Sequence, residues 1–310
     1  GTPAYVYSAD HIRSRLRAYR SIVEPSVGVV CYAMKALGSL AVLRLVAKTG
    51  AGLDIVSGGE LFRVEKAGGD VSKVVFAGVS KSDEEIAAAI RAGILFFNVE
   101  SPAEVDVIDA IARRMKRIAP ISIRVNPGVD AKTHRHITTG KAENKFGIPR
   151  ADLSALLRKI RRLRGVRLVA LDAHIGSQIT SIGPYRESIR VLLDLARGVR
   201  AAGYDIEYVD VGGGIGIRYR NETEIDVAEF ERAVIRPVAD AGFRPVMEPG
   251  RSVVGNAGVL VTRVRFVKPS GRRNFVMVDT GMHHLVRVAM YEAHHEIVPV
   301  REAARGAPHP

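Results

Sequence analysis

Short β-rich runs alternate with amphipathic segments along most of the chain. The predicted strands lie at residues 27–33, 53–56, 74–76, 95–99, 121–125, 168–174, 207–211 and 245–248. Between them, apolar residues recur at helical spacing, for example at residues 40–48, 102–116, 153–163, 185–201 and 227–241. Strands that alternate with helices in this way predict a parallel sheet.

Three of the predicted helices begin with a recognisable signal. The segments 57–60 (SGGE), 82–85 (SDEE) and 101–104 (SPAE) each match the capping box, in which a Ser and a Glu three residues later satisfy free backbone N–H groups. In the third segment, Pro102 occupies the first helical position, which favours proline. These signals support the alternation of strands and helices.

Eight strands are the number that closes a (β/α)8 barrel, and residues 27–255 are long enough for that fold. An open doubly wound sheet is the alternative. That fold usually carries a glycine-rich turn after its first strand, and no such turn is present here. We therefore predict an α/β protein built on a (β/α)8 TIM barrel.

The pattern changes after the eighth strand. Residues 257–268 and 274–279 predict longer antiparallel strands joined by a turn at 269–271, and residues 4–7 predict an opening strand. These strands are too few to close a barrel or sandwich, so we expect an incomplete antiparallel β-domain in which the chain stops. The predicted domains are residues 1–26 (a strand and helix associated with the β-domain), 27–255 (the barrel) and 256–310 (the partial β-domain).

The composition is that of an ordinary globular protein, since 47% of the 310 residues are hydrophobic and 25% are charged. No apolar run approaches the roughly 18 residues that a membrane-spanning helix needs, so we expect no membrane partner. Cys31 is the single cysteine, which excludes an internal disulfide and favours a reducing compartment. Because no signal-peptide pattern is present either, we expect a cytoplasmic protein.

Lysine and arginine outnumber the acidic residues by 46 to 33, which gives a net charge of +13. This charge is compatible with nucleic acid or with an anionic substrate. The densest basic segment, 158–167 (RKIRRLRGVR), has apolar residues at helical spacing and no interleaved aromatic residues. It is typical of a solvated helix face, so we expect no nucleic-acid partner.

The ends of the strands carry candidate chemistry, as expected for a (β/α)8 barrel. Lys35 follows the first strand, where desolvation would lower its pKa and suit it to Schiff-base formation. A lysine that extends outward from the barrel rim is an equally compatible interpretation. Asp54 lies in the second strand, and Arg124 lies near the end of the fifth, where it would need an anionic partner. We include Asp54 and Arg124 in the predicted cofactor site.

The last three strands end in residues suited to a phosphorylated ring. His174 ends the sixth strand and is followed by Ser177, while residues 212–216 (GGGIG) and 248–251 (EPGR) follow the seventh and eighth. Barrel enzymes commonly hold a phosphate through backbone N–H groups at these last two positions. A lysine, an acid, a histidine over a flat ring and a phosphate cradle together predict pyridoxal 5′-phosphate (PLP) as the cofactor.

Seven motifs at these positions resemble those of the fold III, alanine-racemase-like PLP decarboxylases, over nearly the whole chain. They are 32–35 (YAMK), 57–61 (SGGEL), 124–128 (RVNPG), 144–148 (NKFGI), 174–179 (HIGSQI), 212–214 (GGG) and 248–251 (EPGR). Within this family, 174–179 together with Arg287 and Tyr291 favours the members that act on diaminopimelate. The resemblance implies decarboxylation of meso-2,6-diaminopimelate to L-lysine and CO2 by a homodimer with shared active sites.

The resemblance also implies a role for each candidate residue. Lys35 would bond PLP as an imine, His174 would stack on the pyridine ring and Glu248 would pair with the ring nitrogen. Arg287 and Tyr291 would bind the distal end of the amino-acid substrate. The phosphate would lie among Ser177, Gly213, Gly214, Gly250 and Arg251, with Arg251 also reaching the substrate.

Two features depart from the family pattern. The family has a Cys-Glu-Ser motif whose Cys donates a proton in the partner subunit's site, and this sequence contains no such motif; Cys31 cannot replace it. Residues 281–288 read GMHHLVRV, where the family usually has Gly-Met-Asn-Asp-Leu-x-Arg-Pro. From the first departure we expect a truncated decarboxylase that acts poorly or not at all.

Other functions stay open on these residues. One is a different fold III decarboxylase, acting on ornithine, arginine or carboxynorspermidine, and another is a non-catalytic homologue that regulates an active subunit. A metal site at the histidine pairs 283–284 and 294–295 is disfavoured, because adjacent histidines on a helix point in different directions and no carboxylate pattern accompanies them.

Overall fold

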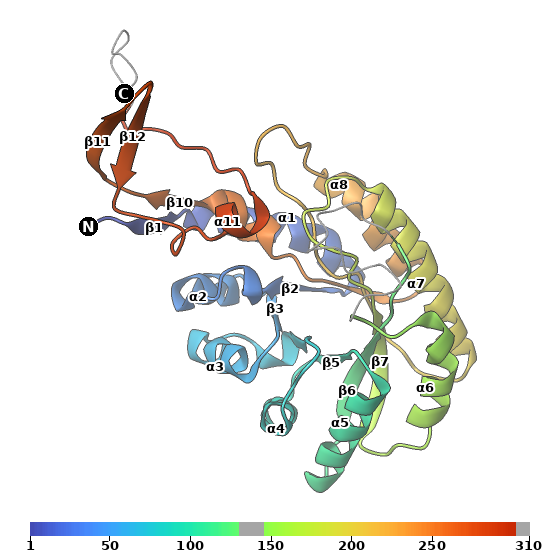
Figure 1. The fold of residues 1–310 in the computed structure, drawn as a ribbon. Helices are drawn as coiled ribbons and strands as arrows, with labels where there is room; N and C mark the ends of the chain where they lie inside the picture. Colours follow the sequence, from blue (N-terminus) through green and yellow to red (C-terminus); the bar gives the residue numbers. More distant parts are fainter. Residues whose placement is uncertain (130–145, 302–310) are drawn as a thin grey trace. The chain divides into compact units, whose positions relative to one another are not determined.

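Eight parallel strands close into a barrel in the computed structural model, which describes residues 1–129 and 146–301 (Figure 1). The strands are β2 (Val29–Ala33), β3 (Gly52–Ile55), β4 (Val74–Phe76), β5 (Phe96–Val99), β6 (Ala119–Arg124), β7 (Val166–Asp172), β8 (Tyr208–Asp210) and β9 (Arg244–Met247). Each strand pairs with the next, and β2 pairs with β9 to complete the ring. The predicted (β/α)8 barrel is confirmed, and the open sheet is excluded.

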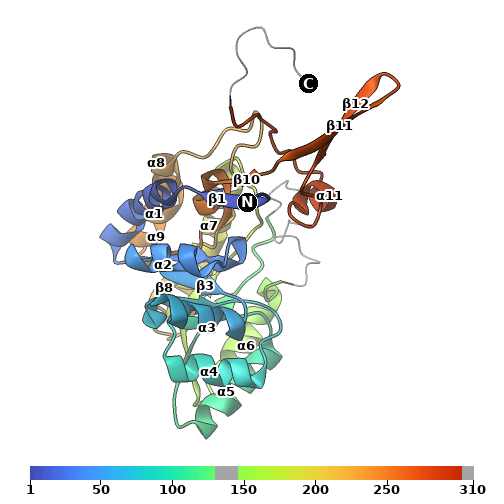
Figure 2. The same cartoon turned by 90° about the vertical axis from the view of Figure 1, so that its left-hand side faces the viewer.

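Helices surround the barrel strands (Figures 1 and 2). The longer ones are α2 (Leu40–Lys48), α3 (Gly58–Ala67), α4 (Asp83–Ala92), α5 (Pro102–Arg114), α6 (Leu153–Ile160) and α7 (Gly183–Ala201). The predicted helix at 227–241 consists of α8 (Val227–Phe230), a π-helical turn (Glu231–Ile235) and α9 (Arg236–Asp240). A short helix, α10 (Arg251–Val254), follows β9.

The predicted helix starts are present, but only one of the three is a complete capping box. The hydroxyl groups of Ser57, Ser82 and Ser101 each accept the N–H of the Glu three residues later. Only Glu85 also accepts the N–H of its own capping serine. In the other two helices the Glu side chain accepts the N–H of the residue before the serine, namely Val56 or Glu100.

The chain divides into two compact units, and the barrel unit comprises residues 9–217 and 223–256. Helix α1 (Ala9–Val23) belongs to this unit, whereas the strand β1 (Ala4–Tyr7) that precedes it belongs to the other. The predicted grouping of residues 1–26 is therefore split at residue 8. The physical reason is the apolar face of α1, which buries Ile12, Leu16 and Tyr19 and packs on its barrel neighbours α2, α10 and β2.

The barrel strands are buried along almost their whole length, which explains their continuous apolar sequences. Cys31 lies among Val75, Phe96 and Tyr208 in this core and is fully buried. Its Sγ contacts the carbonyl oxygen of Lys73 at 3.4 Å. Burial also raises the pKa of the Cys31 thiol well above its usual value. Cys31 is therefore a small packing residue.

The second unit contains residues 1–8, 218–222 and 257 onward, of which the structure describes those up to 301. Here β1 pairs antiparallel with β10 (Gly258–Val261), and β11 (Val264–Ser270) pairs with β12 (Arg273–Val278); α11 (Arg287–Tyr291) follows. The predicted strand at 257–268 is thus two strands. The break occurs where Oδ1 of Asp279 accepts the hydroxyl of Thr262 and the N–H of Arg263, which removes that N–H from strand pairing.

None of the helices within the described residues is both long enough and apolar enough to cross a membrane. Two sequence predictions fall partly outside the described residues. They are the first two positions of the 144–148 motif and residues 302–310 of the predicted β-domain.

Candidate active site

Lys35 and Asp54 form an ion pair at the carboxyl ends of β2 and β3. Lys35 lies in a one-turn 3-10 helix, Met34–Ala36, and its Nζ is 2.5 Å from Oδ2 of the fully buried Asp54. Desolvation lowers the pKa of Lys35, but the negative charges of Asp54 and Glu248 more than offset it, so the pKa is raised. The expectation of a lowered pKa is therefore wrong, because it considered desolvation without the carboxylates that the fold brings to the amine.

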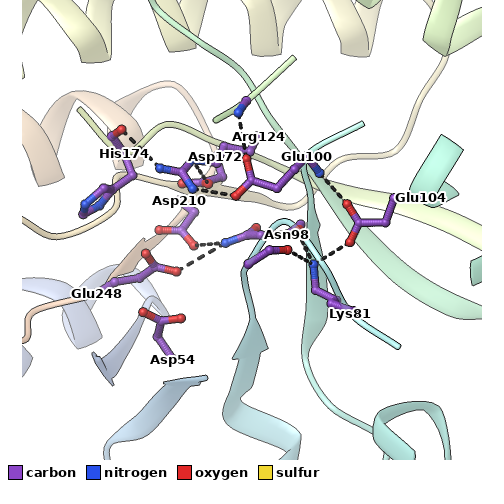
Figure 3. A network of polar contacts seen from close by, with 12 residues as sticks. Asp54, Lys81, Asn98, Glu100, Glu104, Arg124, Asp172, His174, Asp210 and Glu248 are labelled. Carbon is purple, nitrogen blue, oxygen red and sulfur yellow. Dashed lines mark hydrogen bonds and ion pairs between the residues drawn. The ribbon is translucent and has the colours of Figure 1, made fainter. Parts of the chain in front are cut away.

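Three more carboxyl groups converge at these strand ends, from Asp172 on β7, Asp210 on β8 and Glu248 after β9 (Figure 3). All three residues are buried, and one oxygen of each lies within 4.8 Å of the others. Asn98 on β5 donates from Nδ2 to Oε1 of Glu248 at 3.3 Å and to Oδ2 of Asp210 at 3.5 Å. The N–H of Gly212 donates to the other Asp210 oxygen at 2.9 Å. We call Asp172, Asp210 and Glu248 the carboxyl cluster.

The carboxyl cluster holds protons at neutral pH. Burial, together with repulsion between neighbouring carboxylates, raises the pKa values of Glu248 and Asp172 well above their usual range. Burial raises the pKa of Asp210 to about 7, although the Gly212 N–H opposes this shift. With Asp54 and Glu100, five buried acids meet two cations among the described residues, Lys35 and Arg124. Unpaired buried charges are costly, so some of these acids are protonated.

Replacing Asp210 by asparagine is expected to change how stability depends on pH. The pKa of Asp210 rises from 3.8 to about 7 on folding. Between these two pH values the folded state binds more protons at Asp210 than the unfolded state does. The contribution of Asp210 therefore makes the free energy of unfolding fall as the pH rises from about 4 to about 7. Burial lowers the pKa of His174, and this shift makes the free energy of unfolding rise with pH up to about pH 6.5. The informative quantity is therefore the difference in unfolding free energy between wild type and D210N at each pH. Urea unfolding from pH 4.5 to 8 measures it. Parallel stability curves for the two proteins would contradict this prediction.

Arg124, at the end of β6, finds its anionic partners within the protein. Its NH1 is 2.6 Å from Oε1 of Glu100, and its Nε is 3.6 Å from Oδ2 of Asp172. Its NH2 donates to the carbonyl oxygen of His174 at 3.4 Å. Arg124 therefore supports the backbone that carries His174 and neutralises part of the buried acid (Figure 3). The predicted contact of Arg124 with the cofactor stays a prediction.

The ring of His174 is held in one tautomer. The N–H of Gly213 donates to His174 Nδ1 at 3.1 Å, so Nδ1 is the unprotonated nitrogen and the proton lies on Nε2. Burial lowers the pKa of His174 well below its usual value, and the positive charges of Arg124 and Lys35 lower it further. His174 is therefore a neutral, fixed imidazole, and its stacking on the cofactor ring stays a prediction.

The glycines after β8 allow three backbone segments to approach closely. A Cβ on Gly213 would lie 2.0 Å from the carbonyl oxygen of Glu248, and one on Gly214 would lie 2.2 Å from that of Gly176. Gly214 also has φ +94°, a left-handed value that favours glycine. The glycine-rich segment thus brings the β8 loop against the loops that follow β7 and β9.

We expect Gly213→Ala to disturb both stability and the site. The added Cβ meets backbone rather than a flexible side chain, so the β9 end must move, at a cost of about 1–3 kcal/mol or more. Thermal unfolding is expected to show a lower Tm, and an absorbance titration with PLP weaker binding. Gly183→Ala at the start of α7 is the matched control, because its Cβ would meet nothing within 4 Å. Equal Tm values for the two variants would contradict the close approach.

The donors at these strand ends fit a phosphate. Within the described residues, the Ser177 hydroxyl and the N–H groups of Gly214 and Gly250 make no hydrogen bond. Arg251 follows Gly250, begins α10 and brings a guanidinium group. N–H groups that have no hydrogen-bond acceptor, together with a positively charged group, can bind a phosphate group. Gly213 is the exception among the predicted phosphate residues, because its N–H is committed to His174.

Buried oxygen atoms near the ion pair also lack partners within the described residues. They include Oδ1 of Asp54, Oδ1 of Asn98 and Oδ1 of Asp172. Each is a buried acceptor, and buried polar groups ordinarily have a hydrogen-bond partner. The donors and acceptors therefore fit a compact ligand that carries a phosphate, a protonated ring nitrogen and further polar groups, as PLP does.

Arg287 and Tyr291, the predicted substrate residues, lie on α11 in the second unit. The Arg287 guanidinium lies 5.2 Å from the centre of the Tyr291 ring and 5.8 Å from that of Tyr219. Among the nearby histidines, the rings of His283 and His284 lie 4.0 Å apart, and His284 Nδ1 contacts the Thr280 hydroxyl. The substrate contact of Arg287 and Tyr291 stays a prediction.

Sequence reasoning missed four functional side chains of the site: Asn98, Asp172, Asp210 and Glu100. A signal was present for two of them, because Asp172 and Asp210 are charged residues inside apolar strand sequences, LDAH and VDVGGG. Asn98 and Glu100 lie at the end of β5, and the signal for them was a polar and an acidic residue at a strand end. A second lysine was also missed: Lys81 is buried and donates to the carbonyl oxygens of Gly78 and Asn98 and to Glu104.

Comparison with known proteins agrees with this geometry. Residues 9–255 match the family described as pyridoxal-dependent decarboxylase, pyridoxal binding domain. The chain is 44% identical over 300 residues to the diaminopimelate decarboxylase of Neisseria meningitidis serogroup A, covering 97% of this chain and 74% of that protein. It is 41% identical over 309 residues to the diaminopimelate decarboxylase of Aquifex aeolicus, covering 98% of this chain and 72% of that protein.

Solved structures give the same result. The crystal structure of diaminopimelate decarboxylase from Helicobacter pylori complexed with L-lysine superposes with a TM-score of 0.94 at 37% identity, covering 98% of this chain and 76% of that one. The crystal structure of an SrLDC mutant in complex with PLP superposes with a TM-score of 0.80 at 25% identity, covering 94% of this chain and 73% of that one.

Proposed function

This chain belongs to the diaminopimelate decarboxylases, a group within the pyridoxal-dependent decarboxylases, and we propose that the residues at the strand ends of its barrel perform the reaction. The chain is a PLP-dependent carboxy-lyase that converts meso-2,6-diaminopimelate to L-lysine and CO2. The assignment of residues rests above all on the Lys35–Asp54 pair, which places an amine beside buried carboxyl groups.

Lys35 provides the amine that attaches the cofactor. PLP, when bound, supplies an electron sink for the electron pair left on the α-carbon when CO2 departs. The Asp54 carboxylate lies 2.5 Å from the Lys35 ammonium. It orients the amine, and its negative charge favours the protonated form of Lys35. When Lys35 loses this proton, Asp54 is the acceptor within hydrogen-bond distance.

Glu248 is the residue that would face the pyridine nitrogen. Asn98 orients its carboxyl group, and Asp210 lies beside it in the same hydrogen-bonded set. Glu248 has a raised pKa because it is buried among other carboxyl groups. A protonated ring nitrogen beside it would supply the missing positive charge, so that Glu248 could ionise and keep that nitrogen protonated. The cluster thus supplies charge stabilisation in a water-poor interior, where it is most effective.

His174 and the uncommitted donors would bind the rest of the cofactor. The neutral imidazole offers a flat face and donates from Nε2. Ser177, Gly214, Gly250 and Arg251 would hold the phosphate, the last with a positive charge. Fixing both ends of the cofactor would orient it for reaction, which lowers the entropic cost of the chemical step.

The remaining assignments also belong to the proposal. Arg287 and Tyr291 would bind the distal end of the amino-acid substrate, and the protein would act in the cytoplasm as a homodimer. Strands β11 and β12 support a protein partner for the second unit, because every residue of both is exposed, including Phe266 and Phe275. Light scattering at several concentrations would test the homodimer.

The proposed function is tested by trapping the cofactor and assaying the product. Incubation with PLP, reduction with borohydride and peptide mass analysis should locate the adduct on Lys35. CO2 release should be greatest with meso-2,6-diaminopimelate when ornithine, arginine and carboxynorspermidine are assayed in parallel. A folded chain with no adduct would overturn the assignment and would favour a regulatory homologue.

A further inference from the structure

Gln178, in the loop after β7, joins three successive loops at the carboxyl end of the barrel through one side chain. Its Nε2 donates to the carbonyl oxygen of Ile217 at 2.6 Å, and its Oε1 accepts the N–H of Ile217 at 3.2 Å. The same Oε1 accepts NH1 of Arg251 at 3.1 Å. Ile217 lies in the loop after β8, and Arg251 begins α10 after β9. Only an amide side chain both donates and accepts in this way.

The backbone around Gln178 is held in an unusual conformation. Gln178 has φ +60°, a left-handed value that residues other than glycine, asparagine and aspartate rarely adopt. The next residue, Ile179, donates its N–H to Gly214 and accepts the N–H of Gly216, both at 2.9 Å. Ile179 is thereby paired with the β8 loop, and the turn at Gln178 directs its amide toward Ile217 and Arg251. A residue keeps such an unfavourable backbone conformation only where contacts with the surrounding structure hold it there.

Gln178 holds Arg251 through an acceptor that carries no charge. The hydrogen bond fixes the orientation of the Arg251 guanidinium, and the amide itself adds no counter-charge. A long, flexible cation that is held in place by a neutral acceptor is suited to binding an anion.

We propose that Gln178 is a positioning residue that orients Arg251 and the β8 loop toward the phosphate of the cofactor. This inference rests on the proposed function, in which Arg251 and Gly214 hold that phosphate. Gln178 acts through Arg251 and touches neither the reacting carbon nor the ring. Its replacement should therefore weaken the binding of phosphorylated ligands and spare the binding of the ring itself.

The experiment compares PLP with pyridoxal, which has the same ring and aldehyde but no phosphate. Gln178→Glu keeps the size and the acceptor oxygens, loses the donor to Ile217 and adds a negative charge beside Arg251. We expect its Kd for PLP, measured by absorbance titration, to rise about 10- to 100-fold, and its Kd for pyridoxal to change less than about threefold. Gln178→Ala should show the same selectivity, with inorganic phosphate competing less strongly against PLP than in the wild type.

Two controls separate positioning from general destabilisation. Asp109 accepts the N–H groups of Arg164 and Gly165 at 3.1 and 2.6 Å before the start of β7, at the opposite end of the strand. Asp109→Asn should lower the Tm and leave the ratio of PLP to pyridoxal affinity unchanged. In an Arg251→Met background, Gln178→Glu should have little additional effect on PLP affinity, because the two residues act as a unit.

The outcomes separate this inference from the proposed function. If wild-type protein binds PLP and forms the Lys35 adduct while Gln178→Glu binds PLP equally well, the positioning role is wrong and the proposed function stands. An equal loss of PLP and pyridoxal affinity would also overturn it, since that result indicates a structural role alone. If the wild-type protein binds no PLP, the proposed function itself fails.

Discussion

Replacing Lys35 by alanine should abolish covalent attachment of PLP and lower kcat for diaminopimelate by roughly 10³-fold or more. Lys35 is the amine that lies against Asp54, with its Nζ 2.5 Å from the carboxylate. Lys81, whose side chain is buried at this end of the barrel, cannot replace it. Its three N–H groups are committed to the carbonyl oxygens of Gly78 and Asn98 and to the Glu104 carboxylate.

Borohydride reduction followed by peptide mass analysis checks the attachment, and CO2 release checks kcat. Lys159→Ala is the matched control, because Lys159 lies on the outer helix α6 and pairs with Asp106. It should leave the adduct and kcat unchanged. Circular dichroism should show that K35A is folded, since the Lys35 side chain is partly exposed and its removal leaves the barrel core intact. An adduct on K35A, or activity near that of the wild type, would show that another amine serves the cofactor.

Replacing Glu248 by glutamine should lower kcat by roughly 10²-fold while keeping the fold. Glutamine preserves the size of the side chain and an oxygen for the Asn98 amide, which lies 3.3 Å from Oε1 in the wild type. What it removes is the negative charge that can keep a pyridine nitrogen protonated. The loss also relieves repulsion within the carboxyl cluster, so the Tm of E248Q should be equal to or higher than that of the wild type.

The readout that identifies this role is spectroscopic. The absorbance of bound PLP should change its pH dependence in E248Q, because the ring nitrogen no longer has an ionisable partner. Glu207→Gln is the control: Glu207 lies just before the start of β8, and its carboxylate pairs with Arg244, 3.5 Å away. It should leave the spectrum and kcat as in the wild type. A kcat for E248Q within about threefold of the wild type would contradict a role for Glu248 at the ring.

The sequence by itself determined the barrel and the position of its chemistry. Alternating strand and helix patterns allow few arrangements, and eight strands that must pair in parallel close most readily into a ring. Because the strands all run in one direction, residues that follow them in the sequence gather at the same end of the barrel. That rule placed Lys35, His174 and Glu248 together without any knowledge of their contacts.

Only the tertiary structure decided which of these side chains contact one another and how the contacts shift their pKa values. Asn98, Asp172 and Asp210 lie on three different strands, and Glu248 follows a fourth. Periodicity along one strand shows which side chains point inward but not which inward side chains touch. The raised pKa of Lys35 follows from such contacts.

The sequence likewise does not show which hydrogen bonds a single backbone N–H group or side-chain amide makes. The N–H of Gly213 binds His174 rather than a ligand, and the amide of Gln178 joins loops that are about 40 and 70 residues away along the chain. Hydrogen bonds of this kind depend on distances of a few tenths of an ångström, which closure of the whole barrel sets. The sequence therefore determined where the chemistry lies, and the closed barrel determined how it is arranged.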